Sequence, residues 1–267
     1  MYGKPYSELT FTDDFMFCKV LTTNLDLCQE LLELVLGIKI RRLAPPESQK
    51  TINTTYDGRG IRLDVYVEDD SNTVFNIEMQ TTIRRGLPRR LRYYQSMIDL
   101  DLLERGADFR QLKKSYVIFL CLDDPFGHNL PVYQFENLCV QKPDVPLGDD
   151  TVKVVVNAAG SRDGISDELA GFLNYLSSNT AESGLPKRLQ EAVGKAITHE
   201  EWEAEYMTMR MKIQEEREEA MQQGMQLGKL DLLRNLMTNL KMTCAQAMDA
   251  AGIPAAEREL YASQIDQ

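Results

Sequence analysis

The chain has 267 residues, of which 43% are apolar and 27% charged, and its formal net charge at pH 7 is −11. This length holds one sizeable domain with an appendage, or two small domains, and the composition is ordinary for a globular protein. The five cysteines are scattered and the two histidines form no motif, which argues against a disulfide scaffold, a zinc site and histidine-based catalysis.

No stretch of the sequence approaches 18 consecutive apolar residues. The N-terminus, MYGKPYSELTFTDD, lacks the apolar segment of a signal peptide. Because the scattered cysteines also suggest reduced thiols, we expect a cytoplasmic protein that does not cross a membrane.

Two helices are expected near the N-terminus, over residues 10–20 and 24–36. The second has an inner apolar stripe and is followed by Gly37, a residue that commonly ends helices. Asp13 and Asp14 fall in the first turn of the first helix. There, a negative charge offsets the helix dipole, and this role explains both residues on physical grounds alone.

The segment 61–80, IRLDVYVEDDSNTVFNIEMQ, predicts two antiparallel strands joined by a polar turn. Apolar and polar residues alternate along both strands, so each strand has an apolar and a polar face. If the turn centres near Ser71, Asp64 lies directly opposite Glu78, with Cβ atoms about 5 Å apart. Gln80 follows on the same face of the second strand.

Two carboxylates that lie this close repel each other unless they share a proton, a cation or a metal ion. Mg²⁺ suits them, because it binds one or two carboxylates together with water and phosphate oxygens. The backbone carbonyl of Met79 offers a further oxygen. The alternative is an ordinary solvated face of a hairpin, and the alternation by itself favours that simpler explanation.

An arginine-rich segment directly after the hairpin shifts the balance towards a phosphate-binding site. Residues 81–95, TTIRRGLPRRLRYYQ, contain no acid, although the chain has 41 acidic and 30 basic residues. Arginine suits phosphate because its planar guanidinium binds two oxygens at once. We expect a helix from about 87 to 105, with one tyrosine packed in the core. The candidate nucleic-acid contacts are Arg84, Arg85, Arg89, Arg90, Arg92 and Gln95.

Further strands are expected beyond this helix. The apolar run at 114–122 is typical of a central strand covered on both faces, and strands are also expected at 132–141 and 151–157. Together with the hairpin they predict an α/β fold with a mixed central sheet of about five strands, flanked by helices.

From residue 166 the pattern becomes helical, with helices expected at 167–178 and 184–197 and a long Glu-rich helix after residue 199. Charge runs of this kind are usually solvated helix faces. Met207, Met211 and Met221 form an apolar stripe that serves either packing within the chain or a homodimer contact through the C-terminal helices. We therefore divide the chain into a core at 1–165 and a helical C-terminal region at 166–267.

The segments RLDVYVED, FNIEMQ and RRLRYYQSMID together resemble the PD-(D/E)XK nuclease superfamily. Within it, they are most similar to the bacterial recombination-promoting nuclease and transposase group, as are the opening TDDFMFCKVL and the late EEREEAMQQGMQLGKL. The resemblance covers roughly the first 140 residues well and the remainder in pattern only. It implies a restriction-endonuclease-like αβββαβ core with a helical C-terminal extension.

The resemblance also implies a function: a DNA endonuclease that uses Mg²⁺ or Mn²⁺ and has low sequence specificity, linked to recombination, mobile elements or defence against foreign DNA. The implied catalytic residues are Asp64, Glu78 and Gln80. The implied metal ligands are Asp64, Glu78, the Met79 carbonyl and Asp14. Gln80 stands where the family usually has lysine, and an amide can orient a water molecule but cannot deprotonate it.

Two other hypotheses stay open. The missing lysine and the acidic net charge also fit a catalytically weak or inactive nuclease-fold protein that acts as a DNA-binding or protein-interaction module. Such a module would keep salt-sensitive DNA binding but show no metal-stimulated cleavage. The Glu-rich helix also fits a structural or regulatory protein that assembles through it.

Overall fold

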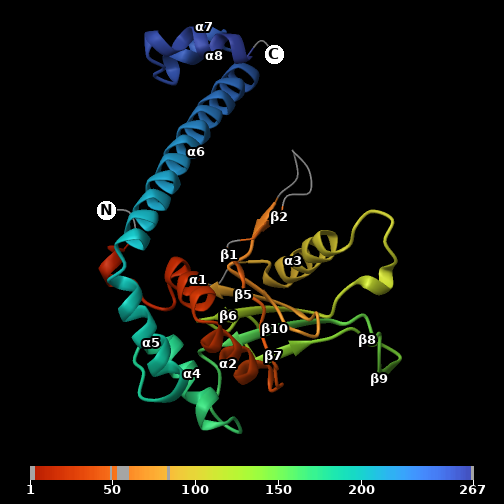
Figure 1. Cartoon of the computed structure of the whole chain (residues 1–267). Helices are drawn as coiled ribbons and strands as arrows, with labels where there is room; N and C mark the ends of the chain where they lie inside the picture. Colours follow the sequence, from red (N-terminus) through yellow and green to blue (C-terminus); the bar gives the residue numbers. More distant parts are fainter. Residues whose placement is uncertain (1–3, 49, 53–59, 83–84, 266–267) are drawn as a thin grey trace. The chain divides into compact units, whose positions relative to one another are not determined.

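The centre of the computed structural model is a six-stranded sheet (Figure 1). Its strands lie in the order β1 (Glu47–Ser48), β4 (Val65–Glu68), β5 (Val74–Gln80), β6 (Ser115–Cys121), β10 (Thr151–Asn157) and β7 (Val132–Phe135). The pairs β5–β6 and β6–β10 are parallel, and the other three pairs are antiparallel. The structure describes all residues except 1–3, 49, 53–59, 83–84 and 266–267. This mixed sheet, with its helices, confirms the predicted fold class.

Two further pairs of short strands lie outside the central sheet, β2 (Thr51–Ile52) with β3 (Ile61–Arg62) and β8 (Leu138–Cys139) with β9 (Lys142–Pro146). The helices are α1 (Asp14–Thr23), α2 (Leu25–Leu36), α3 (Leu87–Leu102), α4 (Asp167–Ser178), α5 (Gly184–Ile197), α6 (Glu200–Leu240), α7 (Cys244–Ala250) and α8 (Arg258–Ile265), with short 3-10 turns η1 (Tyr6–Glu8), η2 (Phe109–Gln111) and η3 (Ala255–Glu257). The helices predicted at 24–36, 167–178 and 184–197 are confirmed as α2, α4 and α5.

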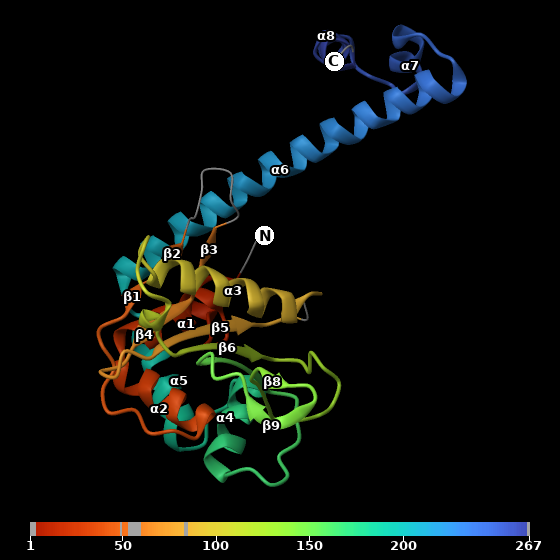
Figure 2. The same cartoon turned by 90° about the vertical axis from the view of Figure 1, so that its right-hand side faces the viewer.

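Helices cover the sheet on both faces. Figure 2 shows α3 on one side of the sheet and α2, α4 and α5 on the other. On the α3 side, Leu91 and Ile98 of the helix pack in one apolar cluster with Val117 and Phe119 of β6. Every residue of β6 is buried, which confirms the prediction of a central strand covered on both faces.

The first strand of the predicted hairpin is interrupted. β3 pairs with β2, and β4 begins only at Val65, so Leu63 and Asp64 lie in neither strand. Leu63 packs in the same apolar cluster as Tyr66, three residues later. The prediction of an unbroken alternation along the first strand is therefore wrong, because the bend at Asp64 shifts the alternation by one residue.

One further strand prediction is changed by the structure. The strand predicted at 132–141 is split, because only β7 joins the central sheet while β8 pairs with β9. All residues of β8 and β9 are exposed, so no core contact holds them in the central sheet.

The chain forms two compact units, Lys4–Glu203 and Ala204–Gln267. In the first unit, α4 and α5 pack against the N-terminal helices α1 and α2. In the second, the end of α6 forms a small core with α7 and α8 around Leu233, Met248 and Tyr261. The division at residue 165 stays a prediction about where the nuclease-like core ends.

The middle of α6 is exposed to solvent. Met207, Met211 and Met221 have 47%, 62% and 68% of their surface accessible. Among the described residues, these side chains therefore do not pack into a core. Within the same residues, no helix combines the length and the apolar character that are needed to cross a membrane.

Two glycines give opposite expectations for the stability of the first unit. Gly37 ends α2 in the left-handed conformation (φ 65°), so Gly37→Ala should destabilise the unit by about 1–2 kcal/mol. Gly194 lies inside α5 with open space around its Cα, so Gly194→Ala should stabilise it by about 0.5–1 kcal/mol. Urea unfolding of the full chain, followed by the fluorescence of Trp202, measures both. If both substitutions changed the free energy of unfolding in the same direction, this account of the end of α2 would be contradicted.

Candidate active site

The edge of β5 next to β4 brings the two predicted carboxylates together. Val65 of β4 pairs with Ile77 of β5 in antiparallel register. The same register, continued by one residue beyond the end of β4, places Asp64 opposite Glu78, which agrees with the pairing predicted from the turn at Ser71. Asp64 itself lies in the bend that precedes β4.

The two residues are linked by reciprocal hydrogen bonds to the backbone. The backbone N–H of Asp64 donates to Oε1 of Glu78, and that of Met79 donates to Oδ2 of Asp64, both at 3.1 Å. These two bonds take the place of backbone-to-backbone hydrogen bonds just beyond Val65, where the pairing of β4 with β5 ends. Each carboxylate has a second oxygen that these bonds do not use.

Burial makes both carboxylates costly to ionise. The pKa of Asp64 is raised to about 6, mainly by burial and to a smaller extent by the nearby charge of Asp14, while the hydrogen bond from Met79 opposes the shift. Burial also raises the pKa of Glu78 well above its usual value, and the charge of Asp64 adds to this. Buried acids with raised pKa values and a charged neighbour are common at functional sites.

The chemistry of this donor set fits a hard divalent cation. The carbonyl of Gln80 accepts a hydrogen bond from the backbone N–H of Leu122 on the β6 side, so the carbonyl of Met79, one residue earlier in the strand, faces the side of Asp64. Two carboxylates and one carbonyl match the oxygen ligands of Mg²⁺, which keeps several waters. Among the described residues, no group of three acidic, histidine or cysteine side chains is arranged so that it could hold a metal ion, so Asp14 as a ligand stays a prediction.

Buried polar residues continue along the same face of β5. Asn76, Glu78 and Gln80 have 0%, 4% and 7% of their surface exposed, because α3 covers this face of the sheet. The alternative of a solvated hairpin face is therefore wrong. Asn76 favours the ionised form of Glu78, yet neither polar atom of its amide makes a hydrogen bond of standard geometry.

Gln80 is held at both ends of its amide. Its Nε2 donates to the carbonyl of Thr82 at 2.6 Å, and its Oε1 accepts from Nη1 of Arg90 at 2.5 Å. Nη2 of Arg90 also donates to the hydroxyl of Tyr94 at 3.3 Å. The residue in the usual lysine position therefore contacts an arginine of α3.

The other predicted nucleic-acid contacts fall into three groups. Arg85 lies just before α3, Arg89 and Arg92 lie in its first two turns, and all three are exposed. Arg84 lies outside the described residues. Gln95 is buried, and its amide donates to Asp99 and to Ser115. The contact of Gln95 with nucleic acid stays a prediction, as do those of the arginines.

The cluster of Arg90 with Gln80 and Tyr94 is not among the sequence predictions. The i, i+4 spacing of Arg90 and Tyr94 puts both on one side of α3, next to the core residues Leu91 and Ile98. This spacing is the sequence signal from which a contact between Arg90 and Tyr94 could have been predicted. The position of Gln80 beneath this side of the helix depends on how α3 docks on the sheet, which no local pattern contains.

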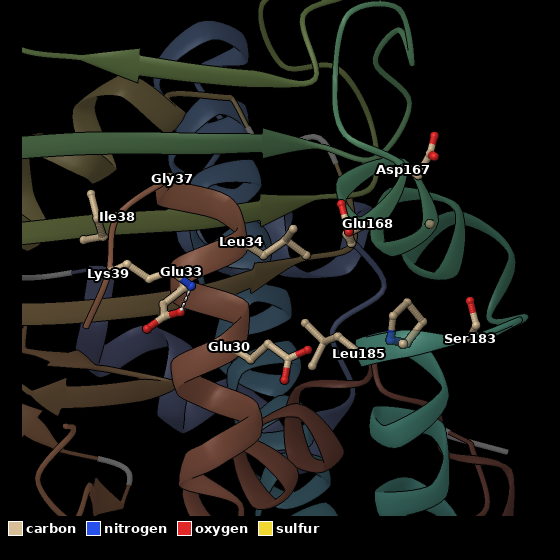
Figure 3. Close-up of a pocket in the computed structure, with 13 residues that line it drawn as sticks. Glu30, Glu33, Leu34, Gly37, Ile38, Lys39, Asp167, Glu168, Ser183 and Leu185 are labelled. Atoms are coloured by element: carbon tan, nitrogen blue, oxygen red, sulfur yellow. Dashed lines mark hydrogen bonds and ion pairs between the residues drawn. The ribbon is translucent and has the colours of Figure 1, made fainter. Parts of the chain in front are cut away.

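A cavity of about 600 Å³ lies elsewhere in the first unit, between α2, α4 and α5 (Figure 3). Its lining includes the acids Glu30, Glu33, Asp167 and Glu168, together with Lys39, which pairs with Glu33 at 2.8 Å. None of the predicted site residues lines it. Because its acids repel phosphate, it does not extend the candidate site.

Comparison with known proteins agrees with the geometry. Residues 11–139 match the family model described as PD-(D/E)XK nuclease family transposase. The match contains the carboxylate pair and all of α3, and it confirms the resemblance seen in the sequence. No curated protein and no solved structure matches the chain. The match indicates a nuclease-type function, that of a hydrolase acting on DNA.

Because the pKa of Asp64 is raised, replacing this carboxylic acid by an amide should stabilise the fold by an amount that depends on pH. The pKa lies near 6 in the folded chain against a usual 3.8, so ionised Asp64 destabilises the fold above about pH 6, and this penalty vanishes as the pH falls towards 4. Asp64→Asn should therefore raise the free energy of unfolding at pH 8 by about 1 kcal/mol or more, and hardly at all at pH 4.

Urea unfolding in EDTA at pH 4, 6 and 8 measures this gain. Glu191→Gln, which removes an exposed acid from α5, is the control for the loss of one negative charge. If the difference in the free energy of unfolding between Asp64→Asn and the wild type does not grow with rising pH, the raised pKa of Asp64 is contradicted.

Proposed function

We propose that this chain, whose residues 11–139 match the PD-(D/E)XK nuclease family transposases, is a metal-dependent DNA endonuclease. The observation that carries the proposal is the pair of half-buried Asp64 and buried Glu78, which lie together where the pairing of β4 with β5 ends and are followed by the arginines of α3. Two carboxylates this close are stabilised by a bound cation, because each raises the cost of ionising the other.

The residues divide the work between them. Asp64, Glu78 and the carbonyl of Met79 would hold Mg²⁺ or Mn²⁺, with Asp14 adding negative charge nearby. When bound, such an ion polarises the scissile phosphate and lowers the pKa of an attacking water molecule. Arg85, Arg89 and Arg92, with Arg84 and Gln95 as further candidates, would contact the phosphate backbone. Backbone contacts carry no sequence information, so specificity should be low.

The biological setting follows from the family and the composition. We place the enzyme in the cytoplasm, and we link its activity to recombination, mobile elements or defence against foreign DNA. These assignments are proposals, as are the preference for Mg²⁺ and the internal position of the cut.

A second candidate function is a DNA-binding or protein-interaction module with little or no cleavage. One observation favours it: Gln80 replaces the usual lysine and both ends of its amide are already occupied. In such a module, DNA binding persists while metal-dependent hydrolysis is lost.

Plasmid cleavage separates these candidates. Purified wild-type chain should nick or linearise supercoiled plasmid with Mg²⁺ or Mn²⁺ and not with EDTA. Asp64→Ala and Glu78→Ala should each lower the rate by about 100-fold or more, because each removes a group that acts directly on the reacting centre. Thermal melting checks that the variants are folded.

A wild-type chain that binds DNA but never cleaves it with either metal would reject the endonuclease and leave the binding module. Cleavage that survives both substitutions would instead place the active site elsewhere in the chain.

We also propose that the chain forms a homodimer through its C-terminal helices. A single Asp64–Glu78 site cuts one strand at a time, so a duplex cut needs a second site. Met207, Met211, Met221 and Met225 are spaced along one side of α6 and are 47–68% exposed. Exposed apolar stripes on a helix are typical of protein contacts.

Substitutions on α6 test the dimer in the full chain. Met211→Glu combined with Met221→Glu should convert a dimer into a monomer, because charge is then placed inside the contact. Ile213→Glu, on another side of the same helix and 41% exposed, is the matched control and should leave the mass unchanged. Light scattering after size exclusion measures the mass. A monomeric wild type, or a dimer unaffected by the double substitution, would reject this contact.

A further inference from the structure

We infer that Arg90 is the resident cation of the candidate site, and that Gln80 and Tyr94 are the residues that position it. Its guanidinium would orient the scissile phosphate beside Asp64 and Glu78. The inference rests on the proposed nuclease function and assigns Arg90 a task that differs from that of the exposed arginines of α3.

Hydrogen bonds fix Arg90 on the site side of α3. Nη1 donates to Oε1 of Gln80 and Nη2 donates to the hydroxyl of Tyr94. Gln80 is itself anchored, because its Nε2 donates to the carbonyl of Thr82. A guanidinium has five N–H donors, so these two bonds leave donors for an anion.

Aromatic rings fix the plane of the guanidinium as well. The Cζ of Arg90 lies 5.1 Å from the ring centre of Phe119 and 5.5 Å from that of Tyr94. The centres of these two rings lie 5.6 Å apart. A guanidinium held by two rings and two hydrogen bonds has lost most of its rotamer freedom before substrate arrives, which is what orientation of a reacting group requires.

The charge of Arg90 acts on both carboxylates. It lowers the pKa of Asp64 and that of Glu78, against the larger effect of burial. Arg62 also lowers the pKa of Asp64. Among the arginines predicted to contact nucleic acid, Arg85, Arg89 and Arg92 are exposed, whereas Arg90 is half-buried.

Gln80 then has a different task from the lysine it replaces. The amide of Gln80 accepts a hydrogen bond from Arg90 and donates one to the backbone carbonyl of Thr82. Gln80 therefore holds the positive charge of Arg90 near the site, whereas a lysine would carry the charge itself. Arginine stays protonated in proteins, and Arg90 therefore binds and orients phosphate but does not act as a base.

Arg90→Gln removes the cation and leaves a shorter, neutral amide. We expect kcat to fall by about 100-fold with KM nearly unchanged, because the interaction acts mainly on the developing charge. Arg92→Gln, which removes an exposed phosphate contact, should instead raise KM by a few fold with kcat nearly unchanged. Arg105→Gln, an exposed arginine beyond α3, should change neither.

Rescue distinguishes a positioned cation from a merely structural arginine. In the Arg90→Gln background, Gln80→Lys returns a positive charge to the site and should recover about 10-fold in kcat. Tyr94→Phe removes one bond to Arg90 and should lower kcat by a few fold without changing KM. If Arg90→Gln does not fold by thermal melting, Arg90→Lys takes its place and should lose kcat while keeping KM.

The proposal is overturned if Arg90→Gln behaves like Arg92→Gln, or if Gln80→Lys gives no recovery. A wild type that does not cleave rejects the nuclease function instead, and Arg90 is then judged by fluorescence anisotropy with a short DNA duplex in Ca²⁺. There, a loss of affinity larger than that of Arg92→Gln and restored by Gln80→Lys supports the positioned cation, while an equal or smaller loss overturns it.

Discussion

The repulsion between two buried carboxylates is the constraint on which the rest of the candidate site depends. Asp64 and Glu78 are held opposite each other by backbone hydrogen bonds, and burial penalises the charge on both. Removing charge from water is expensive unless a partner compensates it. Positive charge nearby therefore stabilises the ionised pair. Arg90 supplies part of this charge, and a divalent ion would supply more.

The buried polar face of β5 shows that this site lowers the stability of the fold. All seven residues of β5 are buried, and neither polar atom of the Asn76 amide makes a hydrogen bond of standard geometry. An unpaired buried polar group costs about 1–3 kcal/mol. An apolar residue at this position would pack under α3 without that cost, so a polar strip that persists here is better explained by function than by packing.

Much of this architecture could be predicted from local patterns, and the exceptions share a physical cause. Helix periodicity located α2, α4 and α5, and the polar turn near Ser71 set the register that opposes Asp64 and Glu78. The bend at Asp64 escaped prediction because it depends on the pairing of β3 with β2. The burial of Gln80 and its contact with Arg90 escaped for a similar reason, since both arise only when α3 docks on the sheet.

The bonds that replace the strand ladder at Asp64 have a spectroscopic consequence. The amide protons of Asp64 and Met79 each point at a carboxylate oxygen of the pair, and the resonance of an amide proton shifts with the charge on its acceptor. These two protons therefore serve as reporters built into the backbone. Their nuclear magnetic resonance signals would follow proton release and cation capture at the pair in the unmodified chain, without any label attached to the site.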